Sequence, residues 1–437
     1  MATPKVPKVP KVFDAIVAGA GPAGSTVAYA LSRANATVAL IDKAVFPREK
    51  ACGGGLQARV FRHLPVDVTP VIRNSMNGVC FSYKFGDRYE RHHHEPIVYG
   101  VLRREFDHHL LQQAVGQGSA LFEGTAVTGF EQEGSNRVRV STSAGVLYGR
   151  VLIGADGANG VVRRALNAEP AFFNQAGLSF EIGREEILEE NFDNRVIRVD
   201  WGTLPSGYAW IFPKTESVNI GVGAPVAIGR DLRRYLHEFL SRERILKADR
   251  VDVESLNVTG HKLPSFTERT RLREGNVLVV GDAAGLIEPF TGDGISYGIH
   301  SGRLAAETVR RWLCGDEQAL SEYPGMVWRE IVPELVSSRK LMTFFNTFPG
   351  LVHKASKLDD RAWEIFCRVL KGEDSFDAFR RKALGPLHFL WKPIDRFPLA
   401  YETRRLVRSR TGTVPRGRSG RLRGESSSGG SRSGGAP

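Results

Sequence analysis

The sequence predicts an α/β protein in which an antiparallel sheet is inserted into a Rossmann-like dinucleotide-binding domain and a helical region follows. Three observations predict this architecture. A strand–helix–strand unit with a glycine-rich turn opens the chain, strand-like runs crowd residues 177–222, and helical patterns dominate after residue 326. At 437 residues the chain is long enough for two domains.

The opening unit carries the sharpest motif. Residues 12–18 (VFDAIVA) and 37–42 (TVALID) have the apolar character of buried parallel strands, and residues 22–34 that of a helix beginning near Pro22. The spacing Gly-x-Gly-x-x-Gly between strand and helix permits a tight turn, close approach of a pyrophosphate and packing of helix on strand, while an acid ending the second strand suits a ribose. The expected cofactor-binding residues here are Gly19, Gly21, Ala23, Gly24, Asp42 and Lys43. A fold element of this kind also argues against a cleaved secretory signal at the N-terminus.

A second glycine-rich segment favours a flavin over a nicotinamide cofactor. Residues 281–284 (GDAA) follow the apolar strand 277–281, and residues 289–295 (PFTGDGI) open a helix expected over 295–314. Asp282 would hold the ribityl region. Backbone N–H groups around Gly292, Gly294 and Ile295 would stabilise negative charge on a reduced flavin. A purely structural turn before a helix is the alternative.

Together these motifs resemble the FAD enzymes with the para-hydroxybenzoate hydroxylase fold and, within them, the geranylgeranyl reductases. The resemblance covers roughly residues 12–345. Residues that carry it are Gly19–Gly24 with Asp42, Cys52–Leu56 (CGGGL), Arg103–Asp107 (RREFD), Gly154–Gly157 (GADG), Tyr208–Pro213 (YAWIFP) and Gly281–Ala284 with Pro289–Ile295. The CGGGL loop, the aromatic strand and Ser301-Gly302 are the parts that point to prenyl reduction. One departure is Gly298, where relatives usually carry alanine.

The resemblance also implies cofactor contacts outside the glycine turns. Arg103 would reach the FAD phosphates or ribose, Asp156 would shape the nucleotide pocket, and Val127 is expected to line it. The residues alone leave alternatives open. Arg103 and Asp107, four residues apart on a helix, could form a surface ion pair, and Asp156 could cap a turn.

Two segments are expected to serve the chemistry and the substrate. By resemblance, Cys52, Gly53 and Gly54 form a catalytic loop in which the thiol lies beside the flavin and the substrate double bond; the alternative is a small buried sulfur. Tyr208, Trp210 and Phe212 alternate at period two and therefore share one face of a strand. They form either an aromatic wall for a long apolar chain or part of an ordinary core.

The resemblance implies FAD-dependent reduction of carbon–carbon double bonds in a geranylgeranyl (isoprenoid) chain, with hydride from reduced flavin N5 and a proton from Cys52 or water. No second Gly-x-Gly-x-x-Gly unit is visible, so the external reductant is expected to be transiently bound NADPH or ferredoxin. The alternative function is an FAD-dependent monooxygenase hydroxylating an apolar or aromatic substrate. A halogenase would require a Trp-x-Trp-x-Ile-Pro segment that this sequence lacks. A binding protein with a vestigial nucleotide fold would be colourless.

The expected domain boundaries follow from these assignments. Residues 12–70, 101–165 and 266–325 are expected to form the FAD-binding domain, and residues 71–100 with 166–265 the substrate-binding sheet domain. Residues 1–11 form an N-terminal extension, 326–400 a helical C-terminal region and 401–437 a disordered basic tail, whose composition has too few apolar residues to fold.

Charge and cysteine content bear on partners and location. The ends carry most of the net charge of +12, so the body is nearly neutral, and no fold signature indicates a specific nucleic-acid partner. Four cysteines without C-x-x-C spacing, and no long apolar run, favour a cytoplasmic protein. A lipidic substrate, the segment Leu341–Lys354 and the Arg-rich tail motivate a hypothesis of peripheral membrane contact. A redox-protein donor is a further candidate partner.

The run His92-His93-His94 with Glu95 is not assigned as a metal site. Consecutive residues on an extended chain point to alternate sides, and no further cysteine or histidine lies at ligand spacing. The sequence therefore predicts no metal.

Overall fold

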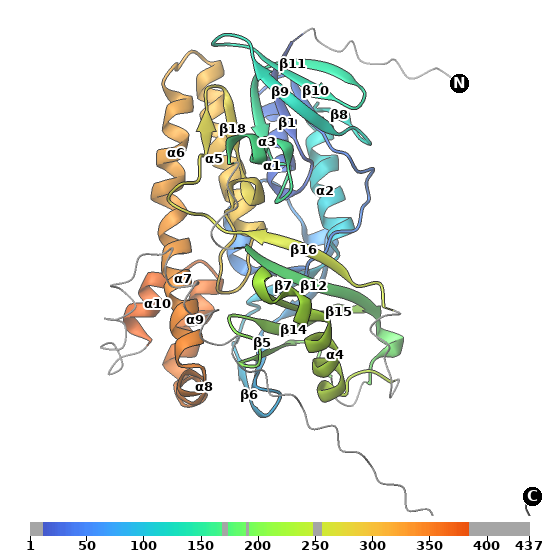
Figure 1. Ribbon diagram of the computed structural model, residues 1–437, viewed down its shortest axis with the longest axis vertical. Helices are drawn as coiled ribbons and strands as arrows, with labels where there is room; N and C mark the ends of the chain where they lie inside the picture. Colours follow the sequence, from blue (N-terminus) through green and yellow to red (C-terminus); the bar gives the residue numbers. More distant parts are fainter. Residues whose placement is uncertain (1–11, 168–173, 189–191, 248–255, 384–437) are drawn as a thin grey trace, which may run out of the picture.

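The computed structural model describes residues 12–167, 174–188, 192–247 and 256–383. The predicted N-terminal extension and the basic tail lie outside these ranges. In Figure 1 one sheet and its helices occupy the upper part of the molecule and a second sheet the lower part, with the last helices packed along one side. The α/β architecture with C-terminal helices is therefore confirmed.

The upper sheet is built around β1 (Phe13–Ala18). This strand pairs in parallel with β2 (Val38–Ile41) on one side and with β11 (Gly145–Gly154) on the other. Among the described strands the order is β17-β18-β11-β1-β2-β8, and β10 and β9 continue from β11 as an antiparallel extension. The remaining strands are β8 (Ala120–Phe122), β9 (Val127–Gln132), β10 (Val138–Thr142), β17 (Arg273–Glu274) and β18 (Val277–Val279). Because chain order reverses at β1, its carboxyl end is where such sheets bind ligands.

Helix α1 (Pro22–Arg33) packs between α2 (Arg103–Gly116) and α5 (Ile295–Leu313). The crossing with α5 is tight, because a Cβ at Gly302 would lie 2.8 Å from the carbonyl oxygen of Ala23. At Gly298 an added Cβ would meet the Ala23 methyl at 3.6 Å, an ordinary contact, so this position has room for alanine. The departure noted at Gly298 therefore leaves the packing intact.

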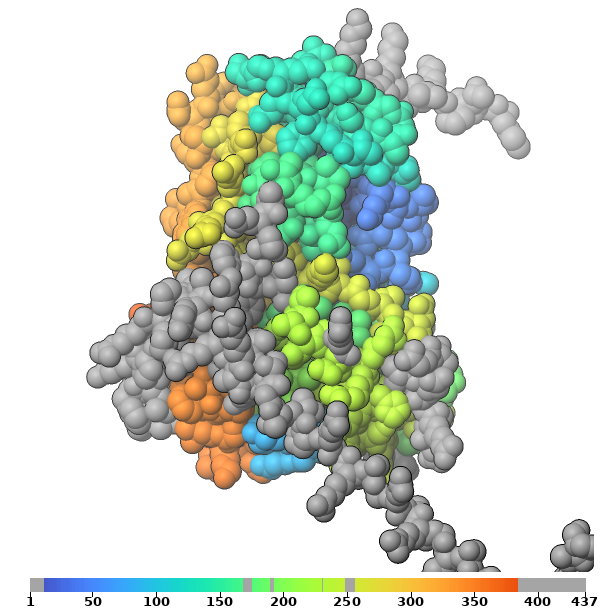
Figure 2. All heavy atoms as spheres, in the orientation of Figure 1, coloured from blue at the N-terminus to red at the C-terminus, as the bar shows by residue number. Residues whose placement is uncertain are grey.

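The lower sheet has the order β16-β12-β15-β14-β13-β5-β6 among the described strands. Its pairs are antiparallel, as expected, except that β13 runs parallel to β5. Helix α4 (Leu232–Glu243) covers one face and buries Leu236 and Phe239 against β15. The strands are β5 (Gly78–Tyr83), β6 (Asp87–His92), β12 (Asn174–Gly183), β13 (Val196–Trp201), β14 (Tyr208–Pro213), β15 (Ser217–Pro225) and β16 (Thr259–Pro264). In Figure 2 these strands lie below β9–β11, which form the upper end of the visible surface.

A small third sheet joins the two larger ones. It pairs β7 (Val98–Val101) with β3 (Gly55–Gln57) and β4 (Ile72–Met76). Residues 71–100 thus supply strands to two sheets, because β5 and β6 from the same segment extend the lower one. The short helix α3 (Val161–Leu166) follows β11.

Prolines stand at the start of two of the C-terminal helices. Pro333 and Pro349 lie in the first turns of their helices, where a missing N–H costs little. The helices are α6 (Ala319–Glu330), α7 (Val332–Thr347), α8 (Pro349–Leu358), α9 (Asp360–Leu370) and α10 (Phe376–Lys382). Leu341 and Phe344, part of the segment behind the membrane hypothesis, are buried in their cluster, whereas Leu351 is exposed.

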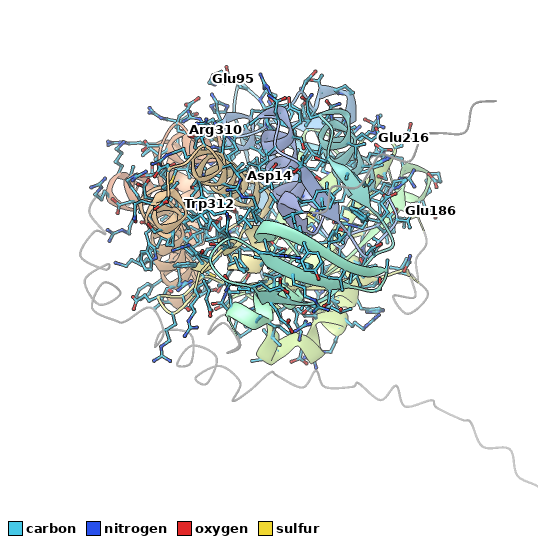
Figure 3. All side chains as sticks on the ribbon, turned by 90° about the horizontal axis from the view of Figure 1, so that it is seen from above. Asp14, Glu95, Glu186, Glu216, Arg310 and Trp312 are labelled. Atoms are coloured by element: carbon cyan, nitrogen blue, oxygen red, sulfur yellow. The ribbon has the colours of Figure 1, made fainter. Side chains whose placement is uncertain are left out.

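Polar contacts close the upper end of the molecule. Arg150 on β11 lies 3.6 Å from Asp14 and its guanidinium covers the ring of Trp312 at 4.9 Å, which ties the end of α5 to β1. Figure 3 views this end from above, with Asp14 and Trp312 near the middle and Glu95 toward the rim. Within the described ranges, no helix has both the length and the apolar character needed to cross a bilayer.

Candidate active site

One cavity of about 890 Å³ connects the glycine turn after β1 with the inner face of the lower sheet. Helices α7–α9 contribute to its wall. The predicted site residues that line it are Gly19, Gly21, Ala23, Asp42, Lys43, Cys52, Gly53, Gly54, Arg103, Val127, Asp156, Tyr208, Trp210, Phe212, Asp282, Gly292, Gly294 and Ile295. Residues up to 276 positions apart in the sequence are therefore brought to one cavity, and Gly24 is the one predicted residue absent from its lining.

The glycine turn has the geometry that its spacing predicts. Gly19 has φ +105°, and a Cβ there would lie 2.3 Å from the carbonyl oxygen of Ala155. Gly24 lies in α1, where a Cβ would lie 1.8 Å from the carbonyl oxygen of Gly19. Its role is thus to let α1 pack on the turn. Asp42 accepts hydrogen bonds from the backbone N–H groups of Ala20 (2.8 Å) and Ala44 (2.9 Å) while bordering the cavity.

Two arginines share one buried carboxylate beside this turn. Arg103 donates to both oxygens of Asp107 at 2.8 Å, and Arg48 lies 3.0 Å from the same group. The ion pair considered in the sequence exists, but it is inside the molecule, since the Asp107 side chain is fully buried. Burial is the largest effect and would lower the pKa of Arg103, but the charge and hydrogen bonds of Asp107, together with Cys52, outweigh it, so the pKa is raised. Arg48 Nη2 lies 3.6 Å from where a Cβ at Gly21 would be, and the buried Nη1 has no hydrogen-bond partner among the described residues.

A second polar group lines the cavity near the end of β18. Asp282 Oδ2 lies 3.5 Å from His261 Nε2, and the Lys50 ammonium lies 2.8 Å from the same nitrogen. Burial would raise the pKa of Asp282, but His261 and Lys50 together hold it below its usual value. Burial lowers the pKa of Lys50. Lys50, His261 and Asp282 therefore form one polar cluster along this arm of the cavity.

Asp156 combines the two roles that the sequence left open. Its Oδ2 accepts a hydrogen bond from the Val162 N–H (2.8 Å) at the start of α3, and the residue also borders the cavity. Oδ1 is buried and has no partner. Burial raises the pKa of Asp156 to about 6.

The loop before α5 is held by a buried acid. Glu288 accepts hydrogen bonds from the backbone N–H groups of Phe290 and Thr291, and burial raises its pKa. The hydroxyl of Tyr208 donates to the Thr291 carbonyl at 2.8 Å, which links the aromatic strand to this loop. Gly292 has φ +77°, a conformation that favours glycine.

The backbone of the Cys52–Gly55 loop packs directly against the ring of Phe212. Added Cβ atoms at Gly53 and Gly55 would lie 2.9 and 2.8 Å from the ring of Phe212, so only glycine fits this approach. The Cys52 sulfur accepts the Gly54 N–H at 3.4 Å and hydrogen-bonds with Arg103. Cys52 is half-buried and borders the cavity, so it is not a sulfur sealed in a core.

The aromatic strand β14 presents its three rings to the cavity. The Trp210 indole rests on glycines of the neighbouring strands, and a Cβ at Gly221 would lie 2.2 Å from its ring. Beyond this wall the cavity continues into an apolar arm between the sheet and helices α7–α9. Its lining includes Phe81, Trp201, Phe345, Trp363 and Phe366.

The histidine run lies away from the cavity. Ligand atoms of His93, His94 and Glu95 come within 4.8 Å of one another. However, His93 Nδ1 accepts the Glu95 N–H at 3.1 Å, and the Glu95 carboxylate is paired with Lys371. These contacts give the group a structural role at the end of β6.

Several cavity residues were not predicted from the sequence. Arg48 and Lys50 lie in an irregular loop whose signal was only two cations just before the CGGGL motif. His261 ends up beside Asp282 because β16 is the edge strand nearest the upper sheet. The glycine floor under Trp210 was readable as glycines alternating at period two, Gly221 and Gly223, next to an aromatic strand.

A dinucleotide-binding sheet that shares one cavity with a second, aromatic-faced sheet defines the class of FAD-dependent oxidoreductases. The chain matches the FAD binding domain family over residues 12–316 and belongs to it. Similar proteins include an uncharacterized protein of Methanosarcina barkeri, 31% identical over 77% of this chain and 84% of that protein. Geranylgeranyl diphosphate reductase of Rhodobacter capsulatus is 30% identical over 69% of this chain and 76% of its own length. The chain thus belongs to the geranylgeranyl reductase group of FAD-dependent oxidoreductases.

A solved structure has the same fold. The geranylgeranyl bacteriochlorophyll reductase-like protein of Thermoplasma acidophilum aligns with a TM-score of 0.64 over 91% of this chain and 95% of that one. At 19% identity, this likeness concerns the fold alone.

The residues present fit FAD. The orphaned Arg48 Nη1 beside Gly21, together with Arg103 and Lys50, offers positive charge where the glycine turn admits a pyrophosphate. The start of α5, with its Gly292–Gly294 turn, offers backbone donors to an electron-rich ring edge. The positive side chains and the two glycine turns therefore agree with the match to the FAD binding domain family.

Proposed function

We propose that this protein reduces carbon–carbon double bonds of a geranylgeranyl or related isoprenoid chain, using FAD. The observation that carries the proposal is the continuity of one cavity from the cationic glycine turn to an apolar arm lined by aromatic side chains. A cofactor site that opens into an apolar space lined by aromatic side chains suits a substrate that is itself a hydrocarbon chain.

The cofactor-binding half rests on charge complementarity. Gly21 leaves the backbone open, Arg48 and Arg103 supply cations, and Asp42 and Asp282 supply acceptors for hydroxyl groups. Lys43, Val127 and Asp156 complete the proposed pocket. When bound and reduced, FAD supplies the hydride that such a reduction requires.

The protein's own contribution is a dry, oriented substrate site. The rings of Tyr208, Trp210 and Phe212 would contact the prenyl chain and exclude water from the double bond. Tyr208 is fixed by its bond to the Thr291 carbonyl, so the wall and the loop before α5 hold a constant spacing. Cys52, with Gly53 and Gly54, is the proposed catalytic loop, and the thiol proton is held at the cavity edge.

The relatives support the isoprenoid class without fixing the carrier. The Rhodobacter relative is named for geranylgeranyl diphosphate, and this chain would take a chain of the same polyprenyl kind. NADPH or a ferredoxin is the proposed external reductant.

The test is a single turnover in the absence of oxygen. Photoreduced, FAD-loaded protein is mixed anaerobically with geranylgeranyl diphosphate or geranylgeraniol, and the product mass and flavin absorbance are followed. The proposal predicts a mass gain of two hydrogens per flavin reoxidised. If reoxidation needs oxygen and the product gains an oxygen atom, the monooxygenase alternative replaces the proposal.

A further inference from the structure

A polar network lies beside the aromatic wall on the same face of the lower sheet, and Lys214, Glu181 and Asn219, which form it, are outside the cavity lining. The ammonium of Lys214, which directly follows β14, donates to both oxygens of Glu181 on β12 at 2.8 and 2.9 Å. Glu181 also accepts from Ser217 Oγ (2.5 Å) and from Asn219 Nδ2 (3.0 Å) on β15. The carboxylate thus joins three strands of the lower sheet.

The carboxylate fixes which way the Asn219 amide points. Because Glu181 accepts from the NH₂ group, the amide oxygen faces the other way and accepts the Trp210 Nε1–H at 2.9 Å. An indole can only donate through this nitrogen. The hydrogen bonds from Lys214 to Glu181, from Asn219 to Glu181 and from Trp210 to Asn219 can therefore all form only when the Trp210 indole has this orientation.

Lys214 also supports the proposed catalytic loop directly. A Cβ at Gly54 would lie 3.2 Å from Lys214 Cε, and one at Gly53 would lie 3.2 Å from Trp210 Nε1. The lysine methylenes and the indole edge thus lie on two sides of the Cys52–Gly55 loop.

The network is costly as a purely structural feature. The Lys214 side chain is 2% exposed and that of Glu181 is 34% exposed, and burial lowers the pKa of Lys214 although Glu181 opposes the change. An apolar residue of similar shape often serves a fold as well as a buried charge, whereas a buried charge that loses its partner is strongly destabilising. A lysine–glutamate pair at this place beside the cavity wall therefore suggests that the pair orients the side chains of that wall.

We propose that the Lys214–Glu181 pair is a positioning device that holds the Trp210 indole and the Cys52–Gly55 loop in the arrangement that binds the prenyl chain. Lys214 and Glu181 act through Asn219 and Trp210, and neither touches substrate. This inference rests on the proposed function, because its readout is prenyl turnover.

The test removes both charges together, so that no buried ion is left unpaired. The variant Lys214→Met/Glu181→Leu is compared with wild type for FAD content, unfolding temperature and anaerobic kinetics with geranylgeranyl diphosphate. The double variant is expected to retain FAD and fold, while KM rises about tenfold, as loss of one hydrogen-bond constraint of about 1.4 kcal/mol implies. The change in kcat is expected to be smaller.

A cycle with Trp210 separates positioning from stability. In a Trp210→Phe background the network has lost the indole and keeps only its contact with the Cys52–Gly55 loop, so adding Lys214→Met/Glu181→Leu should raise KM less than it does in wild type. Glu243→Gln is the matched control: Glu243 is a buried acid paired with Arg88 and Arg198 in the same sheet region, outside the cavity lining. It should lower the unfolding temperature and leave KM unaltered.

The outcomes distinguish the two proposals. Wild type that reduces no geranylgeranyl compound overturns the proposed function. Active wild type whose KM is the same in the double variant, or equally changed in Glu243→Gln, overturns the positioning role. Loss of additivity with Trp210→Phe supports it.

Discussion

At the scale of single residues, the site depends on cations that lie in an irregular loop. Arg48 forms an ion pair with Asp107, the carboxylate that it shares with Arg103. One nitrogen of the Arg48 guanidinium, Nη1, has no hydrogen-bond partner among the described residues. A buried donor without an acceptor costs about 1–3 kcal/mol. A phosphate oxygen that accepts a hydrogen bond from this nitrogen would remove that cost. Arg48 would then add a second positive charge to that of Arg103 at the phosphate.

Arg48→Ala is therefore expected to weaken FAD binding about tenfold or more, the loss typical of a hydrogen bond to a charged group. Fluorescence titration of the FAD-free protein with FAD measures the change. Arg104→Ala is the control, because Arg104 neighbours Arg103 on α2 yet its side chain is 55% exposed and outside the cavity. Equal losses in both variants would show that general surface charge, not Arg48, attracts the cofactor.

Asp156 makes stability depend on pH in an identifiable direction. Burial raises its pKa to about 6 in the folded protein, against 3.8 for an ordinary aspartate, so between these values the folded state keeps a proton that the unfolded state has lost. Its contribution to the free energy of unfolding therefore falls as pH rises from about 4 to about 6 and is constant above.

Asp156→Asn, which cannot ionise, should consequently become more stable relative to wild type across that window. Chemical denaturation of FAD-free wild type and variant at several pH values between 4 and 7.5 measures the difference. A difference that does not change with pH would mean that Asp156 is solvated in the folded protein.

At the scale of elements, the aromatic strand works because its neighbours carry no side chains beneath it. Gly221 on β15 faces Trp210 so closely that a methyl group would overlap the indole, whereas a methyl at Gly223 would lie 3.4 Å from it. The two glycines lie on one face of the same strand, yet only Gly223 has room for a methyl group. Trp210 can lie flat only where the first remains glycine.

Gly221→Ala is expected to lower the free energy of unfolding by about 1–3 kcal/mol, the usual cost of overpacking. It should also weaken prenyl binding, because the indole must move. Gly223→Ala should be neutral or slightly stabilising, since alanine loses less chain entropy than glycine. Urea denaturation of both variants checks the pair, and equal midpoints would contradict the close packing of Trp210 on Gly221.

The sequence predicted those elements whose signals are local. The β1–α1–β2 unit, the strands β12–β15 and helix α5 follow from periodicity and glycine spacing, and they lie within a few residues of the expected bounds. The parallel pairing of β13 with β5 was not predicted, because the partner strand lies more than a hundred residues earlier. Short strands such as β3 and β7 become ordered through tertiary pairing rather than propensity.

The same limit applies to the site. Motif spacing and the family resemblance together gave eighteen of the residues that line the cavity, but they did not give Arg48, Lys50 or His261. The Lys214–Glu181 pair joins residues 33 positions apart on different strands, so no local pattern marks it. What sequence patterns miss here is which polar side chains meet after two sheets have been brought together.

At the scale of the whole molecule, one cavity is bounded by both large sheets and by helices α7–α9. A ligand that fills it contacts both large sheets and helices α7–α9, so binding should couple their stabilities. A ligand at a hundred times its dissociation constant stabilises the folded state by about 2.7 kcal/mol. FAD is therefore expected to raise the unfolding temperature of the molecule in one transition.

Titration of the FAD-free protein with FAD tests the central claim most directly. The account predicts a flavin absorbance spectrum retained after desalting at one FAD per chain, together with the rise in unfolding temperature. A chain that unfolds as before and retains no flavin after desalting would contradict the FAD site and the reduction built upon it.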